Sequence, residues 1–159
     1  MKKIINKIEK ITEYLLEILL VLLVIMVFFQ VINRFVMHIP AAWTEEFSRF
    51  IFVWASAIGI ALALRKKAHI GLSIIINSFP RALRKIIQFI DQIVMLAFYL
   101  IILYWGSNWS YYGLMESTDS LQWFPMFYVY IAIPFSALLL VIFSIDDLHE
   151  FLIAGNKGK

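Results

Sequence analysis

Four long stretches of the chain contain no charged residue, and they are the strongest structural signal in the sequence. These stretches cover residues 18–33, 50–64, 92–115 and 120–145. A helix of about 20 apolar residues crosses a hydrocarbon core roughly 30 Å thick. The first two stretches become long enough when their amphipathic flanks are added. The sequence therefore predicts an all-α integral membrane protein, a single domain of residues 1–159, with spanning helices at residues 14–35, 43–64, 86–113 and 122–146.

Amphipathic segments flank these spans. In residues 1–17, isoleucine and leucine recur at helical spacing between charged residues, which is typical of a helix lying along the membrane surface. We expect this segment to lie at the interface before the chain turns into the first span. Pro80 favours the start of a helix, so we expect a surface-lying segment before it and a long third helix after it. Pro134 is expected to kink the fourth helix because it removes a backbone donor.

Composition and charge agree with a membrane protein and give it an orientation. With 62% hydrophobic and 16% aromatic residues, the chain is far from the balance of a soluble domain. Most of its 14 lysines and arginines fall before span one, between spans two and three, or after span four, which share one side. The positive-inside rule therefore predicts cytoplasmic termini and an amphipathic cytoplasmic segment between spans two and three. The net charge of +3 is then a topology signal, and no nucleic-acid partner is expected.

Residue types that carry chemistry are scarce in this chain. It has no cysteine, and His38, His69 and His149 lie at or beyond the ends of the predicted spans, so no pair can ligate a haem across the helices. No nucleophile paired with a base, glycine-rich phosphate loop or metal-ligand spacing occurs in the sequence. We therefore expect no enzyme activity and no cofactor. The first apolar run is too long for a signal peptide and is expected to remain in the mature protein.

The two remaining basic residues, Arg34 and Arg49, are predicted at the other side of the membrane. Arg34 either snorkels to the headgroups or forms an ion pair with Glu45 or Glu46, which a short connection brings to the same depth. The acids also suit the positive end of the helix dipole, with Thr44 as N-cap, and Arg49 can pair with Glu45. Four charges at two adjoining helix ends indicate an electrostatic clasp, used either within the subunit or against another protein.

Small residues line one face of the second span. Ala55, Gly59 and Ala63 recur at four-residue spacing, which lets another helix backbone approach closely. That backbone belongs either to the same four-helix bundle or to a partner subunit, and the sequence leaves both open. Trp43 opens the span as an interfacial aromatic residue, and His69 follows it as a solvated or capping residue.

The order of these features resembles that of a known family. The segments that carry the resemblance are Asn33-Arg34, the sequence WTEEFSR at residues 43–49, Gly59, and RKKAHIGL at residues 65–72. In these segments, its length and its four spans, the chain resembles the small membrane subunit, the DctQ-type or Q subunit, of tripartite ATP-independent periplasmic (TRAP) transporters. The resemblance extends over nearly the whole chain and is most specific over residues 33–72.

The resemblance implies a bacterial inner-membrane protein. Its partners would be a large membrane subunit that carries the sodium and substrate sites, a periplasmic substrate-binding protein, and membrane lipids. The family's characteristic positions, where charges would fix helix ends or the subunit interface, correspond to Arg34, Trp43, Glu45, Glu46, Arg49 and His69. Substrates of the family are organic acids, of the sialic-acid or C4-dicarboxylate type. The ending IAGNKGK predicts a subunit encoded apart from the large one. The alternative is a cofactor-free four-helix anchor or assembly subunit of another membrane complex.

Overall fold

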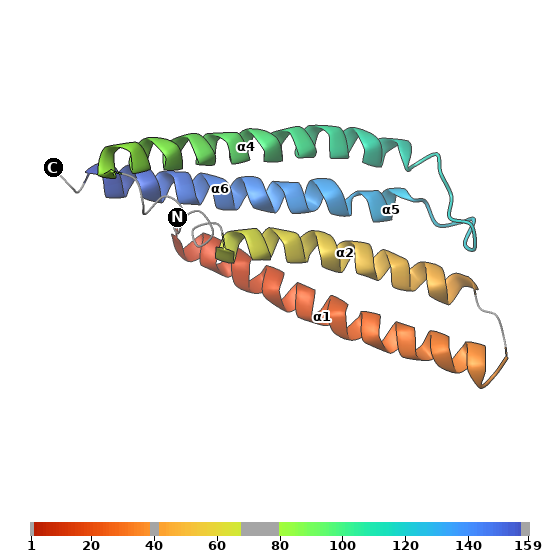
Figure 1. The fold of residues 1–159 in the computed structure, drawn as a ribbon. Helices are drawn as coiled ribbons and strands as arrows, with labels where there is room; N and C mark the ends of the chain where they lie inside the picture. The colour runs from red at the N-terminus through yellow and green to blue at the C-terminus, as the bar shows by residue number, and fades with distance from the viewer. Residues whose placement is uncertain (1, 39–41, 68–79, 157–159) are drawn as a thin grey trace.

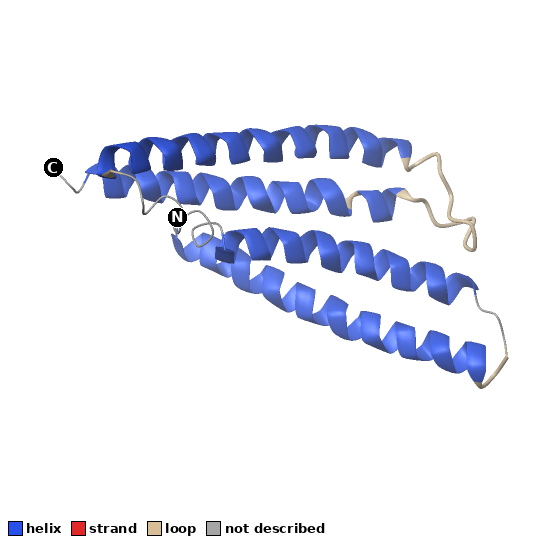
Figure 2. Cartoon of the chain, viewed as in Figure 1, coloured by secondary structure: helices blue, strands red, loops and turns tan. Residues whose placement is uncertain are grey.

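The computed structural model describes residues 2–38, 42–67 and 80–156. Its helices, in chain order, are α1 (Lys2–Phe35), α2 (Ala42–Lys67), α4 (Arg81–Tyr112), α5 (Phe127–Tyr130) and α6 (Ala132–Asn156). With α5 and α6 taken together, four stretches of these described residues are long and apolar enough to cross a membrane, and Figure 2 shows the predominance of helix. The predicted fold class, an all-α membrane protein with four spanning helices, is confirmed.

The four spanning helices lie side by side in one layer (Figure 1), which corrects the expectation of a four-helix bundle. Their order across the layer is α4, α6, α2 and α1. The inner helices are more buried than the outer ones. Half of the most apolar part of the fourth span is buried inside the protein, but none of that of α1 is. In a membrane, lipid tails are as apolar as the helices, so the outer faces of α1 and α4 can contact lipid without a hydrophobic penalty.

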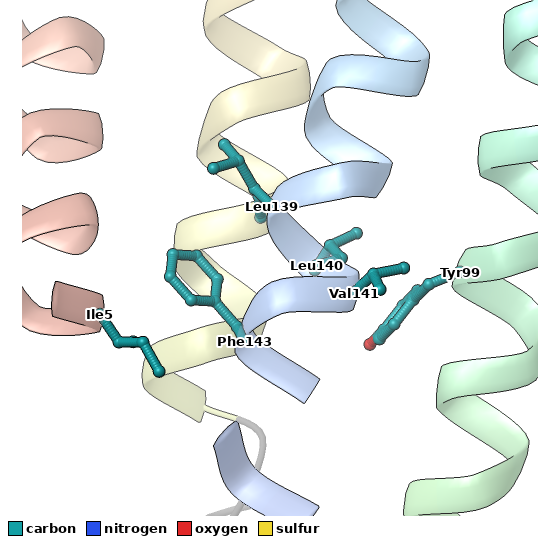
Figure 3. Packing of buried hydrophobic residues seen from close by; sticks show 7 residues of the cluster. Ile5, Tyr99, Leu139, Leu140, Val141 and Phe143 are labelled. Carbon is teal, nitrogen blue, oxygen red and sulfur yellow. The ribbon is translucent and has the colours of Figure 1, made fainter. Parts of the chain in front are cut away.

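Helix α1 is continuous from Lys2 to Phe35, which corrects the expectation that residues 1–17 lie along the membrane surface. Its 34 residues make a helix about 51 Å long. The sequence of α1 contains no proline or glycine that would break the helix. Ile5 is buried in the core cluster that also contains Phe143 of α6 (Figure 3). The first turns of α1 therefore pack against other helices.

Helix α4 begins directly after Pro80, as the sequence predicts. The backbone N–H of Arg84 donates to the Pro80 carbonyl at 3.0 Å, so the proline closes the first turn. The helix is 32 residues and about 48 Å long. It starts before the predicted span of residues 86–113 because the amphipathic turns before residue 86 are also helical. The surface-lying segment expected before Pro80 falls in residues 68–79, outside the described residues.

The fourth span is interrupted between α5 and α6. Pro134 has no N–H, so the Tyr130 carbonyl lacks the donor that a continuous helix would supply, and the helix breaks at Ile131. This interruption lies where the sequence predicts a kink. The span begins at Phe127, later than the predicted residue 122, because residues 114–126 fold into a loop of their own.

The buried core joins all four spans around α6. Figure 3 shows the packing of this cluster, which consists of Ile5, Ala61, Tyr99, Leu139, Leu140, Val141 and Phe143. Ala61 is fully buried and Phe143 is 2% exposed, so α2 and α6 meet closely here. Toward the other end of the layer, Trp54 of α2 donates its indole N–H to the Tyr128 carbonyl of α5 at 2.9 Å. The central helices are thus joined at both ends.

Candidate functional site

The charged residues in the first turns of α2 lie at what we call the loop end of the layer, which comprises Arg34, the first turns of α2 and residues 114–126. Glu46 is only 9% exposed, and its two carboxylate oxygens accept the backbone N–H groups of Asp119 and Ser120, each at 3.0 Å. Hydrogen bonds to an ionised carboxylate are stronger than those between neutral groups. Glu46 therefore fastens the loop of residues 114–126 to α2.

The loop is also held by its own hydrogen bonds. The Thr118 hydroxyl donates to the Leu121 carbonyl at 2.7 Å and accepts the Leu121 N–H at 3.2 Å. The Tyr130 hydroxyl donates to the Glu116 carboxylate at 3.0 Å. At the surface of this ordered loop, Trp123 is 77% exposed. The loop is therefore a fixed element that presents an aromatic side chain.

Arg34 lies near Glu45 and not near Glu46. Its Nη1 is 3.8 Å from Glu45 Oε1, and both side chains are at least half exposed. An exposed pair contributes at most about 1 kcal/mol to stability. The two acids, adjacent in sequence, thus have different surroundings, because successive helix residues point about 100° apart around the axis.

Two other expectations for the start of α2 are wrong. The helix begins at Ala42, so Thr44 is inside its first turn and is not the N-cap. The Thr44 carbonyl accepts the Ser48 hydroxyl at 2.8 Å, as an interior helix residue does. The pair of Arg49 with Glu45 does not form, and Arg49 meets no carboxylate within 4.0 Å in the described part of the chain. Trp43 is 44% exposed, and its position at the membrane interface stays a prediction.

The predicted small-residue face does not act as one contact surface inside the layer. Ala55 is buried, Ala63 is exposed, and Gly59 faces Leu16 of α1 with room for a Cβ, whose nearest atom would be 3.9 Å away. A closer approach occurs at Gly106 of α4, where a Cβ would lie 3.1 Å from Ile133 of α6. The role of the Ala55 face in binding a partner subunit stays a prediction, and His69 lies outside the described residues.

A second polar site, which the sequence analysis missed, lies at the basic end of the layer, where Lys2, Arg65 and the last turns of α6 meet. The Arg65 side chain is 15% exposed and pairs with Asp146 at 2.9 Å, with Asp147, and with Glu9 at 3.5 Å. This Arg65 network joins α1, α2 and α6. The sequence did contain a signal for this site. Asp146 and Asp147 directly follow the fourth charge-free stretch, on the side of the membrane where Arg65 is also predicted.

Two exposed ion pairs surround the Arg65 network. Lys66 lies 2.5 Å from Glu13, and Lys2 lies 2.7 Å from Glu150. Within the ranges that the structure describes, no group of three His, Cys, Asp or Glu side chains is arranged to hold a metal ion. The carboxylates described here accept hydrogen bonds from backbone amides, basic side chains and the Tyr130 hydroxyl.

We expect Glu46→Gln to loosen the loop more than Glu45→Gln does. An amide oxygen accepts more weakly than a carboxylate, and its NH2 group would face backbone donors, so the change should cost about 1 to 3 kcal/mol. Hydrogen exchange at Asp119 and Ser120, measured by mass spectrometry, should become faster. Glu45 carries the same charge one residue away but is half exposed, and its substitution should leave that exchange unchanged. Equal exchange rates in the two variants would contradict the role given to Glu46.

The fold and these polar sites define the class of protein: a multi-pass helical membrane protein whose buried charged contacts join helix ends. The model of the DctQ component of tripartite ATP-independent periplasmic transporters matches residues 23–153, which is most of the chain. The chain therefore belongs to this family, as its resemblance predicts.

Individual relatives agree with this membership. A putative TRAP transporter small permease protein of Haemophilus influenzae is 34% identical over 102 residues, which are 64% of this chain and 62% of that protein. The C4-dicarboxylate TRAP transporter small permease protein DctQ of Vibrio cholerae is 27% identical over 104 residues, 65% of this chain and 44% of that protein. The sialic acid TRAP transporter permease protein SiaT of H. influenzae is 26% identical over 139 residues, 87% of this chain and 22% of that protein. The chain thus spans less than two thirds of the length of each of these relatives.

Proposed function

We propose that this chain is the small membrane subunit of a sodium-coupled TRAP transporter that imports an organic acid. In this proposal a separate large membrane subunit carries the sodium and substrate sites, and the small subunit supports it. The observation that carries the proposal is the match to SiaT. A stretch similar to 87% of this chain forms 22% of that longer permease, so the stretch is found covalently joined to a larger membrane protein.

The distribution of charge favours a role in supporting the large subunit over a role in transport itself. Transport sites for ions and acids need ionisable groups or broken helices near the middle of the membrane. The four charge-free stretches span 15 to 26 residues each, and the ion pairs described above lie at their ends. The break at Ile131 is followed directly by apolar turns of α6. On this basis we assign transport to the partner and assembly to this chain.

The proposed location is the bacterial inner membrane, with both termini in the cytoplasm. The lysines and arginines of the basic end support this orientation by the positive-inside rule. It places residues 114–126 in the periplasm, on the side from which a substrate-binding protein would deliver its ligand. The substrates in the names of relatives are sialic acid, C4-dicarboxylates and, for the TRAP transporter permease protein DctMQ of Oleidesulfovibrio alaskensis, isethionate. All of these are organic acids, and we propose a substrate of that class.

Reconstitution tests the proposal. Liposomes that hold this chain alone should show no sodium-dependent uptake of sialic acid, a C4-dicarboxylate or isethionate. Uptake of one of them should begin only when a large TRAP permease and a substrate-loaded binding protein from the same cell are added. Uptake by the chain alone would contradict the proposal. Copurification from native membranes with the subunits of a different complex would instead support the alternative of a membrane anchor.

A further inference from the structure

A groove of about 230 Å³ opens at the loop end, between α2, α5 and the loop of residues 114–126. Its walls are of two kinds. Phe50, Val53 and Met126 form an apolar surface, while Arg49 and Asp119 bring opposite charges to the same groove. The groove is therefore amphipathic, and we call it the Arg49 groove.

The guanidinium of Arg49 is available to a ligand. Arg49 is exposed and meets no carboxylate within 4.0 Å among residues 2–38, 42–67 and 80–156. Glu46, which lines the same groove, has both carboxylate oxygens occupied by the N–H groups of Asp119 and Ser120. Basic side chains within a membrane span usually pair with an opposite charge or with backbone carbonyls. Arg49 can therefore accept an anion from outside the described chain.

The depth of Arg49 suits a group near the membrane surface. Arg49 follows Trp43 by six positions, so it lies about 9 Å further along α2 than this exposed tryptophan. Tryptophans of this kind mark the level of the lipid headgroups. An arginine side chain reaches several ångströms along its helix toward that level. Lipid phosphates are thus within the range that Arg49 can reach.

We propose that the Arg49 groove binds a membrane phospholipid, with the phosphate on the Arg49 guanidinium and the upper part of an acyl chain on the apolar wall. The planar guanidinium has donors that match two phosphate oxygens. Asp119 can receive the ammonium group of an ethanolamine headgroup. A free phosphate ion would use the guanidinium but leave the half-buried apolar side chains of Val53 and Met126 uncovered, so an amphiphile fits the whole groove better. The inference does not rest on the proposed function.

Lipid titration of the purified full-length chain tests this inference. Delipidated chain in detergent is titrated with palmitoyl-oleoyl phosphatidylethanolamine, and bound lipid is counted by native mass spectrometry. Arg49→Gln should raise the dissociation constant of the first bound lipid at least about tenfold, because charge-assisted hydrogen bonds are lost. Val53→Trp, which fills the apolar wall and keeps the arginine, should weaken binding in the same direction. Arg34→Gln, a matched loss of one exposed arginine at the same end, should change binding less than about twofold.

Two further probes separate the sources of the anion. Dioleoylglycerol, which lacks a phosphate, should bind wild-type chain and Arg49→Gln equally, and inorganic phosphate should not displace the phospholipid. Unchanged phosphatidylethanolamine binding in Arg49→Gln would overturn the proposal, as would an equal loss in Arg34→Gln. Loss of copurification with the large permease, with lipid binding unaltered, would also overturn it and assign Arg49 to a carboxylate of that subunit.

Discussion

Replacing Arg65 with methionine is expected to lower the free energy of unfolding by about 3 to 5 kcal/mol, the usual result of removing one member of a buried ion pair. Asp146 is 2% exposed, and its Oδ2 accepts from Arg65 at 2.9 Å. Its Oδ1 is buried and has no hydrogen-bond partner among the described residues. Without Arg65, this carboxylate would be left buried with neither oxygen paired. The measurement is equilibrium unfolding of the protein in detergent or bilayer discs.

Lys66→Met is the matched control for this change. It removes the neighbouring cation on the same helix, but the Lys66 side chain is 58% exposed, so its pair with Glu13 is screened by solvent. Adding Asp146→Leu to Arg65→Met should recover part of the lost stability, because an apolar pair replaces an unpaired charge. A loss in Arg65→Met no larger than that in Lys66→Met would show that the Arg65 network does not hold α1, α2 and α6 together.

Gly113→Ala is the second change with a large expected effect. A Cβ at Gly113 would lie 2.7 Å from Tyr130 Cδ2 and 2.8 Å from the Phe127 backbone nitrogen, closer than real Cβ contacts allow. The Phe127 N–H also donates to the Gly113 carbonyl at 2.9 Å, so backbone movement would break this bond. Overpacking of this kind commonly destabilises a protein by about 1 to 3 kcal/mol. Unfolding measurements and hydrogen exchange over residues 114–126 should both report the change.

Gly59→Ala provides the comparison for Gly113→Ala. Its new Cβ would meet only the Leu16 side chain, at 3.9 Å, and alanine favours a helix interior by up to about 1 kcal/mol over glycine. The two substitutions should therefore change the free energy of unfolding differently. Gly113→Ala should lower it, and Gly59→Ala should leave it unchanged or raise it. If both variants unfold alike, the tight contact between Gly113 and α5 does not decide the stability of this end.

The two sites have different consequences for the proposed small subunit. The Arg65 network fixes three helices against each other at the basic end. The Glu46 contact fixes a surface loop to α2 at the other end. If the chain supports a larger permease, as proposed, both contacts would contribute rigidity, one within the layer and one in the loop at its surface. The layer arrangement also leaves α1 and α4 open along their lengths for lipid or a partner subunit.

The sequence by itself determined the fold class, the approximate spans and the family. Charge-free stretches of spanning length and the start of α4 after Pro80 are local properties, because hydropathy and backbone propensity act over a few turns. The break near Pro134 is local for the same reason, since it follows from one missing N–H group. The family resemblance is also contained in short segments, and the match over residues 23–153 confirmed it.

Only the tertiary structure decided which polar groups meet and how the helices are arranged. Glu46 accepts N–H groups 73 and 74 residues away, and Arg65 pairs with carboxylates 81 and 82 residues away. Each contact depends on the rotation and tilt of whole helices, and a helix that is apolar on all sides, like the middle of α1, does not reveal which face it will bury. For the same reason the pattern of spans could not show that the four helices form a layer and not the expected bundle.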